Sequence, residues 1–280
     1  MFRSRPARRF LICTALALTT AGFGDYSCAQ SRLEAAYTVT FARIRVGEIT
    51  ATAVLGDSEY TISAQARAGG IMKVLVEGEG SFVTRGTIKN DHLVATNFIS
   101  KIVSNAATYD VKMVFDDGAV TELMVEPPPP TTGTVPVTEA HRRSIVDPLT
   151  AMLPSVRSGE RPSEEACRRT LPIFDGRERY DLKLAFKRTD NVAAEKVYAG
   201  PVVVCSVHYE PIAGHRASAP LVKYLSEGWD MELALAPAGG THLLVPFRVS
   251  VASRVANLVI EANRFETTGR SQAVADPKAQ

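Results

Sequence analysis

The sequence predicts a mainly β protein, in which one long antiparallel sheet curls as a spiral or an open barrel and one or two short helices pack on it. Apolar and polar residues alternate along many short segments, as in strands with one face in a core and one in water. The links between these segments are short. Short links favour antiparallel neighbours, because a parallel crossover needs a dozen residues or more.

Alternation is clear within single segments. In the first clear case, Tyr60, Ile62 and Ala64 share one face and the polar residues between them share the other. The same pattern recurs in three further segments, residues 109–116, 180–187 and 247–251. Each of these segments is predicted to be a strand with one buried face.

Turn-forming residues separate the predicted strands. Asp116, Asp117 and Gly118 predict a tight hairpin between residues 109–115 and 120–125. Further turn residues lie at positions 56–57, 89–91 and 238–240.

Residues 1–29 have the order of a cleavable secretory signal peptide. Four arginines, at positions 3, 5, 8 and 9, precede an apolar run over residues 11–22, and small residues follow at Ser27 and Ala29. The run is shorter than the ~20 residues that span a bilayer, so we expect no transmembrane anchor. We expect cleavage before Gln30 and location in the bacterial periplasm.

Two variants of this signal are minor alternatives. Arg8 and Arg9 resemble a twin-arginine signal, but the residues before them do not match that pattern. Cys28 would be the modified residue of a lipoprotein, but the aliphatic residue that such a signal needs is missing before it.

The net charge of +2 belongs to the predicted signal. Residues 1–29 hold four arginines and one aspartate, so the rest of the chain has 28 basic and 29 acidic residues. A formal charge near −1 provides no phosphate-neutralising surface, and we expect no nucleic-acid partner.

Proline residues interrupt the strand pattern at residues 127–136, where we expect a stiff, extended surface linker. The patterns on its two sides are alike. We therefore expect residues 30–270 to form one β-rich domain, with two sub-halves as the alternative. Residues 271–280 are polar and are predicted to be disordered.

The best helix of the chain is predicted at residues 147–153. Asp147 is a good N-cap, Pro148 suits the first turn and Pro154 marks the end. Its apolar residues fall on one stripe that should dock on the sheet, Leu149, Met152 and Leu153. A second short helix is expected from Ser163 to Arg168.

Cys167 and Cys205 remain once the predicted signal is removed. An even pair of cysteines in an oxidising compartment predicts a structural disulfide, worth about 4 kcal/mol by chain-entropy reasoning. Two free buried thiols or a redox pair are the alternatives, although a redox pair normally has the spacing Cys-x-x-Cys, which is absent.

The sequence resembles an uncharacterised exported family of Gram-negative bacteria, a domain of unknown function. The resemblance lies in residues 37–41 and 46–49, in the Asp-Pro-Leu-Thr-Ala-Met-Leu segment at 147–153, and in residues 167–182 and 205–215, which look like the alphaproteobacterial branch. It implies export and a β fold but no reaction. More loosely, the layout is similar to periplasmic envelope-integrity proteins, in which a long antiparallel sheet spirals around a helix.

The densest polar cluster lies at residues 175–181. We expect Arg177 and Arg179 to share a strand face, with Asp181 beside them. Such a set could bind an anionic head group or a carboxylate. The interpretation that we favour is a turn followed by salt-bridged strand positions.

A second candidate group is His208, Glu210 and His215. If residues 202–210 form one strand, Cys205 faces the core, while His208 and Glu210 are neighbours on the opposite face. A zinc site would use these three residues. No compact zinc-binding pattern is found, however, so we expect neither a metal nor a cofactor.

The sequence also lacks a nucleophile elbow, a phosphate loop and a dinucleotide fingerprint. We therefore predict a non-enzymatic periplasmic protein that supports cell-envelope integrity by binding a lipid, a glycan or a protein partner. One alternative is an envelope-acting hydrolase that uses residues 175–181 or 208–215. Another is a purely structural assembly module.

Overall fold

The computed structural model describes the chain in stretches, residues 30–69, 78–104, 107–156, 163–194, 196–227, 230–252 and 256–269. The predicted signal peptide and the predicted disordered tail lie outside the described residues.

In the part of the chain that the structure describes, thirteen strands form a single sheet, in the order β7-β6-β5-β4-β3-β2-β1-β13-β12-β11-β10-β9-β8. Their bounds are β1 (Ser31–Phe41), β2 (Ile44–Leu55), β3 (Glu59–Ala68), β4 (Gly78–Lys89), β5 (His92–Ser104), β6 (Ala107–Asp116), β7 (Ala119–Glu126), β8 (Arg169–Phe174), β9 (Arg179–Ala194), β10 (Tyr198–Ala213), β11 (Asp230–Pro237), β12 (Leu244–Ala252) and β13 (Leu258–Thr268).

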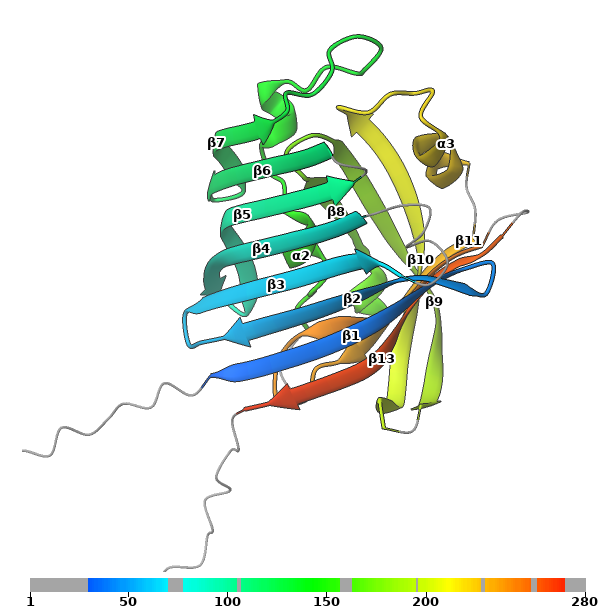
Figure 1. Ribbon diagram of the computed structural model, residues 1–280. Coiled ribbons are helices and arrows are strands. Elements are labelled where there is room, and N and C mark those ends of the chain that lie inside the picture. The colour runs from blue at the N-terminus through cyan, green and yellow to red at the C-terminus, as the bar shows by residue number, and fades with distance from the viewer. Residues whose placement is uncertain are drawn as a thin grey trace, which may run out of the picture.

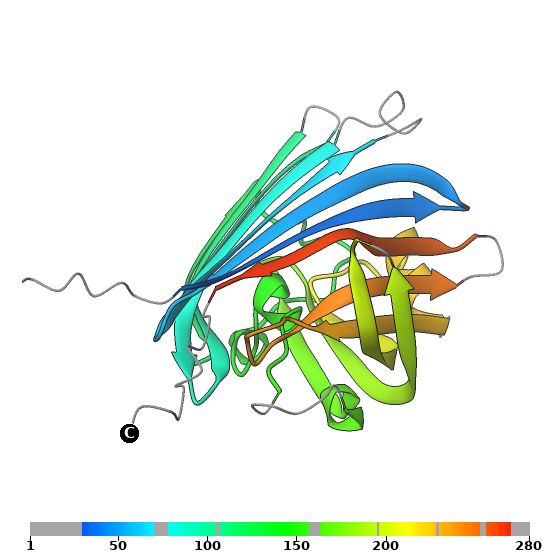
Figure 2. The same ribbon diagram turned by 90° about the horizontal axis from the view of Figure 1, so that it is seen from below.

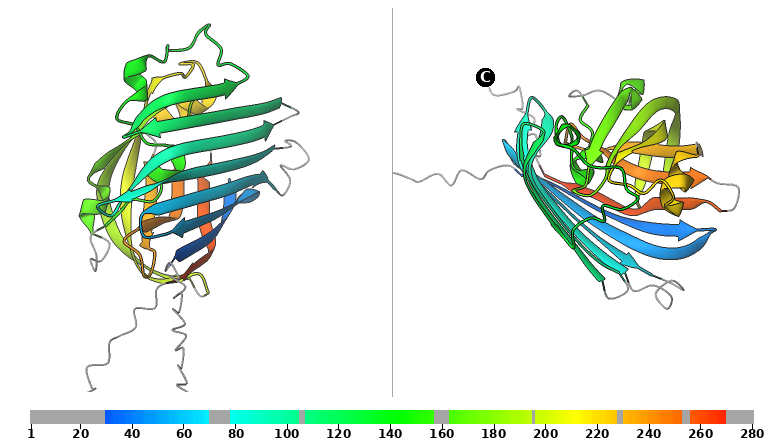
Figure 3. Two further views of the ribbon diagram at one scale, coloured as in Figure 1. Left: turned by 90° about the vertical axis from the view of Figure 1, so that its left-hand side faces the viewer. Right: turned by 90° about the horizontal axis from the view of Figure 1, so that it is seen from above.

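The predicted fold class is confirmed. All neighbouring strands of the sheet pair antiparallel, and the first strand, β1, pairs with the last, β13. The ends of the sheet are β7 and β8, so the sheet curls without closing into a barrel. Figures 2 and 3 show the two halves of the sheet facing each other across the interior.

The predicted strand faces match the core except at Tyr109 of β6, which is 38% exposed, and at Phe186 of β9. Tyr60, Ile62 and Ala64 are buried on β3, and Val111, Met113 and Phe115 are buried on β6. Phe186 was expected inside but remains 40% exposed. The register between β9 and β10 shifts beside it, and such a bulge bends the strand and re-aims its side chains.

The predicted turns are confirmed. Asp117 and Gly118 have φ angles of 45° and 77° between β6 and β7, and Asn90 and Asp91 have 50° and 64° between β4 and β5. Two consecutive positive φ values suit the tight hairpin turns whose twist matches that of the flanking strands.

Helical segments are short, namely η1 (Glu139–Arg142), α2 (Pro148–Ala151), η2 (Glu164–Cys167) and α3 (Pro220–Ser226). The predicted helix at 147–153 is α2, shorter than expected, and the second predicted helix is the 3-10 turn η2. Helix α3 was not predicted, because Ala219 at its N-cap offers no side-chain hydrogen bond.

The open seam between β7 and β8 is closed by loop residues and side chains. The backbone N–H of Ile145 donates to the carbonyl of Gly118, beside β7. The next residue, Val146, donates to Pro172 of β8 and accepts from Phe174. Phe174 itself is fully buried among side chains of β5 and β6, on the inner face of the other half of the sheet.

The proline segment at 127–136 is largely exposed and contains neither helix nor strand, in line with a surface linker. Its two ends are nevertheless attached. Arg177 donates to the carbonyls of Glu126 and Pro127, while Val135 exchanges backbone hydrogen bonds with Gly214 and His215. Figure 1 shows this segment as the green loop next to β7.

A disulfide joins Cys167 of η2 to Cys205 of β10, as predicted. Both cysteines are completely buried, and apolar side chains from β9 to β12 surround them. The bridge fixes η2 to the sheet across a sequence separation of 38 residues.

Within the described stretches, no helix is long and apolar enough to cross a membrane.

We expect the double variant Cys167→Ala/Cys205→Ala to lose about 2–5 kcal/mol of unfolding free energy, because its unfolded chain regains loop entropy. For a domain of this size, Tm should fall by roughly ten degrees. Thermal unfolding followed by circular dichroism measures the loss. Reductant should lower the Tm of the wild type to that of the variant and leave the variant unchanged; an unaltered Tm in the variant would contradict the prediction.

Candidate apolar binding site

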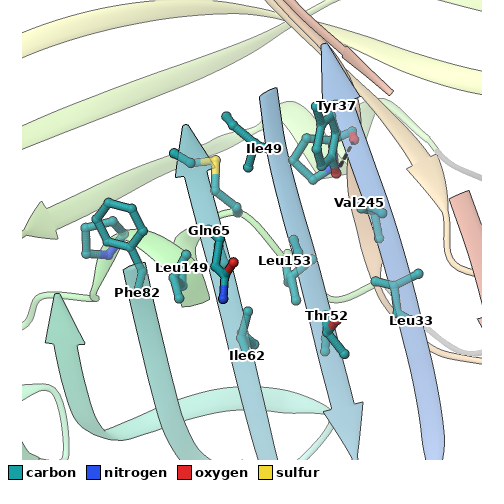
Figure 4. Close-up of a pocket in the computed structure, with 18 of the residues that line it drawn as sticks. Leu33, Tyr37, Ile49, Thr52, Ile62, Gln65, Phe82, Leu149, Leu153 and Val245 are labelled. Carbon is teal, nitrogen blue, oxygen red and sulfur yellow. Dashed lines mark hydrogen bonds between the residues drawn. The ribbon is translucent and has the colours of Figure 1, made fainter. Parts of the chain in front are cut away.

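A cavity of about 350 Å³ lies on the inner face of the curled sheet. Its walls come from β1 to β4, from α2 and from β12 and β13. Figure 4 shows these side chains around the hollow, with Tyr37 and Ile49 in the upper part of the view and Leu33 and Ile62 in the lower part.

Small side chains in the middle of the sheet create the hollow. Ala35 of β1 lies opposite Ala51 of β2, which in turn lies opposite Ala64 of β3. Phe82 of β4 ends this cross-strand row. Because directly opposed residues share a face, the three methyl groups leave a shallow trough along the row.

The large side chains lie at the rim of this trough. Leu33 and Ile62 flank it on one side, each opposite Ala53 of β2. On the other side Tyr37 and Ile49 are cross-strand partners. The trough is therefore bordered by bulky side chains and open along its centre.

Helix α2 and the two residues just after it form the facing wall through their apolar stripe. Leu149, Met152 and Leu153 all line the cavity, together with Pro148. Leu153 also belongs to the core cluster below the cavity, beside Leu33 and other side chains. The predicted docking of this stripe on the sheet is confirmed.

The position of α2 depends on the buried carboxylate of Asp147. Its Oδ1 accepts hydrogen bonds from the backbone N–H groups of Leu149 and Thr150, at 3.0 and 3.2 Å, as an N-cap does. The same oxygen accepts from Thr84 Oγ1 of β4 at 2.6 Å. Asp147 thus joins the start of the helix to the sheet.

The side chain of Asp147 is shielded from solvent. The residue is fully buried, and its Oδ2 has no hydrogen-bond partner in the described part of the protein. Burial therefore raises the pKa of this carboxyl above its usual range, against the lowering effect of the donated hydrogen bonds. Next to it, the hydroxyls of Tyr60 and Thr150 lie 2.8 Å apart in a second hydrogen bond between the sheet and the helix.

The second half of the sheet supplies the remaining wall. Val245 and Val249 of β12 and Ile260 of β13 line the cavity. Tyr37 reaches across from β1 and donates a hydrogen bond to the carbonyl of Pro246 at 3.0 Å. This bond satisfies the one phenol at the rim, which Figure 4 marks with a dashed line.

No charged residue lines the cavity as the described residues define it. The polar residues there, apart from Tyr37, are Thr52 and Gln65, which alternate with the alanines and so belong to the opposite strand faces. A ligand inside would meet hydrocarbon almost everywhere. The cavity suits an apolar group and offers nothing to a charged or sugar-like one.

The polar cluster at residues 175–181 does not form the expected row. Arg177 lies in the turn before β9, where its guanidinium reaches the proline segment and lies 5.3 Å from the ring centroid of Tyr109. Arg179 instead pairs with Asp181 at 2.6 Å, and both side chains are mostly buried. The expectation that Arg177 and Arg179 share a strand face is wrong, because β9 begins only at Arg179.

The turn in this cluster is held by Asp175. Its Oδ1 accepts hydrogen bonds from the backbone N–H groups of Arg177 and Glu178, at 2.8 and 2.7 Å. Burial raises the pKa of Asp175. This is the local geometry of a turn, as the favoured interpretation of the segment expected.

His208, Glu210 and His215 are not brought together. His208 is exposed on β10, and Glu210 pairs with Lys183 at 2.6 Å. His215 is buried, and its backbone carbonyl accepts from Val135 of the proline segment. Among the described residues, no group of three or more histidine, cysteine, aspartate or glutamate side chains is arranged to hold a metal ion.

None of the charged residues predicted as a possible site lines the cavity. A signal for it was present, since inward positions of three consecutive strands carry alanine, at Ala35, Ala51, Ala53, Ala64 and Ala66. The inward positions of β5 and β6 carry large residues instead, such as Phe98 and Met113. A run of small residues on one face of a sheet indicates that space is left between the sheet and the element that faces it.

The comparisons with known proteins concern family and fold. The family described as "Protein of unknown function (DUF3108)" matches residues 36–262. A solved structure, described as a beta-barrel-like protein of domain of unknown function DUF1849 from Brucella abortus, has a TM-score of 0.48 and 10% sequence identity, covering 85% of this chain and 98% of that one. No curated protein matches the chain.

The variant Thr84→Val keeps the shape of the side chain but removes the hydroxyl that donates to Asp147. We expect it to lower the unfolding free energy by about 1–3 kcal/mol at a pH above the raised pKa of Asp147, because the charged carboxylate then loses a donor. The loss should shrink as the pH falls through the raised pKa of Asp147, since the neutral carboxyl needs that donor less. Urea unfolding over a pH series measures this.

The raised pKa of Asp147 also makes the stability of the wild type depend on pH. Because the folded-state pKa of Asp147 is raised, its contribution to stability is greatest at acid pH and declines as the pH rises through that pKa. Thr87→Val, on the same strand, is the matched control and should show no pH-dependent loss. An equal loss in Thr84→Val at every pH would show that Asp147 does not depend on this donor.

Proposed function

The chain belongs to DUF3108, a family of proteins of unknown function, and we propose that it is a non-enzymatic protein of the periplasm that binds an acyl chain of an envelope lipid in the cavity between α2 and the sheet. By holding or passing on such lipids, it supports the integrity of the cell envelope. The apolar cavity is the observation that carries this proposal.

The chemistry of the walls favours a lipid over the other ligands that the sequence allows. A glycan would bury many hydroxyl groups, and each one left without a partner costs about 1–3 kcal/mol. The cavity offers no charged side chain within the described residues, so it cannot provide those partners. An acyl chain needs only apolar contact, and each methylene that it buries contributes about 0.8 kcal/mol.

The size of the cavity agrees with a small apolar ligand. Its volume of about 350 Å³ lies at the lower end of the ~300–1,000 Å³ of ligand pockets. Several lining side chains are only half-buried, among them Ile49, Phe82, Leu149 and Met152. These apolar surfaces have more to gain from a bound ligand than fully buried side chains would have.

Two features support location in the periplasm. The residues before Gln30 have the order of a secretory signal. The disulfide between Cys167 and Cys205 fits an oxidising compartment.

The alternative hypothesis of an envelope hydrolase has less support. Its candidate residues at 175–181 hold a turn and a salt bridge, and His208, Glu210 and His215 lie apart. A catalytic acid–base pair needs groups that converge on one substrate atom.

The test is to extract the protein, purified under gentle conditions, with organic solvent and to identify bound lipids by mass spectrometry. We expect acyl lipid in the wild type. Ala51→Phe should fill the trough and lower lipid content and probe affinity at least tenfold. Ala185→Phe, an exposed position on β9, is the matched control and should bind as the wild type does. Wild-type protein that is free of lipid and ignores acyl probes would refute the proposal.

A series of fatty acids tests the nature of the contact. Each added methylene should strengthen binding about fourfold, which corresponds to 0.8 kcal/mol, until the cavity is full. Displacement of a fluorescent acyl probe measures the affinities. Equal affinities across the series would show that the head group, and not the chain, is recognised.

The envelope role is tested in cells. A strain that lacks the gene should be more sensitive to detergent, and the Ala185→Phe protein should restore resistance while Ala51→Phe does not. Equal rescue by both variants would separate the envelope role from the cavity.

A further inference from the structure

The hairpin between β1 and β2 ends in an exposed apolar pair. Phe41 and Ile44 are 44% and 54% exposed, and they are direct cross-strand partners, so both side chains lie on one face of the hairpin. The hairpin, drawn in blue, extends past the end of β3 in Figures 1 and 2. Two large apolar side chains together at a projecting tip form a contact surface, unlike single exposed residues scattered over a protein.

This tip continues the wall of the cavity. Side chains alternate along a strand, so the face of β1 that lines the cavity through Leu33, Ala35 and Tyr37 also carries Val39 and Phe41. The register shifts on both sides of β1 place the extra residue in the partner strand, at Asn263 in β13 and at Val46 in β2. The alternation along β1 is therefore unbroken from the cavity to the tip.

Between the cavity and the tip, the position on β2 that faces Val39 carries no side chain. Gly47 lies opposite Val39. A Cβ atom at Gly47 would lie 2.9 Å from the carbonyl oxygen of Arg67, so the close approach of β3 keeps this position free of a side chain. An apolar chain lying along β1 meets no large side chain from β2 at this point.

Basic residues accompany the apolar pair. Arg43 lies in the turn and Arg45 follows Ile44, and both are exposed. Arg45 pairs with Glu48 at 2.8 Å, which leaves the tip with the charge of Arg43 in excess. An apolar pair beside a cation matches the boundary of an anionic bilayer, where acyl chains lie below phosphate groups.

We propose that the β1–β2 tip docks on an anionic lipid bilayer, with Phe41 and Ile44 inserted among the lipid chains and Arg43 facing the phosphates. An acyl chain then enters or leaves the cavity along the inner face of β1. The route for the acyl chain rests on the proposed function, whereas the docking can be tested without it.

The test is a flotation assay with protein purified after expression of the full chain. The vesicles contain phosphatidylcholine alone or phosphatidylcholine with 30% phosphatidylglycerol. We expect the wild type to bind the anionic vesicles and to bind the neutral ones several-fold more weakly. Phe41→Ser/Ile44→Ser should lower partitioning into anionic vesicles about tenfold. Ile99→Ser/Met124→Ser, which removes apolar side chains of similar exposure from β5 and β7, should leave partitioning unchanged.

Charge is tested with a second pair of variants. Arg43→Glu should reduce binding to anionic vesicles to the level seen with neutral ones. Arg85→Glu, at an exposed position on β4, is its control and should bind as the wild type does. Circular dichroism and Tm should be the same for all these variants, because every position changed is exposed.

Docking fails as a proposal if the wild type ignores anionic vesicles, or if the serine variants at the tip bind as well as the controls. The cavity variant Ala51→Phe separates the two proposals. It should lose lipid content while it still floats with anionic vesicles. Protein that floats normally but never holds an acyl lipid would leave the docking intact and remove the proposed function.

Discussion

The curled sheet depends on a single buried carboxylate, that of Asp147. The end strands β7 and β8 do not pair with each other, so the curl must be held from inside. Asp147 accepts hydrogen bonds from Thr84 of β4 and from the start of α2, and the residue before it pairs with β8. Asp147 and its neighbour Val146 therefore connect both halves of the sheet to the helix between them. The buried carboxyl is tolerated there because it receives three hydrogen bonds in a site where breaking them is costly.

The same arrangement explains why a cavity persists beside a well-packed core. Phe174 inserts between the two halves of the sheet on one side of α2, and the disulfide holds η2 against β10. Between these fixed contacts the inner face of β1 to β3 carries alanines, and the walls cannot move together to fill the gap. Dispersion contacts are forgone along the trough, and an apolar ligand of suitable width restores them.

Charged residues and the cavity occupy different parts of the protein. Most charged pairs of the described chain lie on the outer surface of strands and short helical turns, as with Arg188 and Glu232, where the ion pair lowers the pKa of the glutamate to about 2. The wall of the cavity carries no charge within the same residues. Polar groups thus hold the scaffold, while apolar groups remain for the ligand and for the exposed tip at Phe41 and Ile44.

The sequence by itself determined the strands, their turns, the cap at Asp147 and the choice of a mainly β fold, because alternation and turn chemistry are local properties of the chain. It also pointed to Cys167 and Cys205, since a pair of cysteines can be counted. Only the tertiary structure decided which strands face each other across the interior, and hence that Ala35, Ala51 and Ala64 border a hollow. The charged residues at 175–181 and His208 to His215 misled for the same reason. Whether side chains converge depends on where a strand begins and on how far the sheet curls, and neither is written in a local pattern.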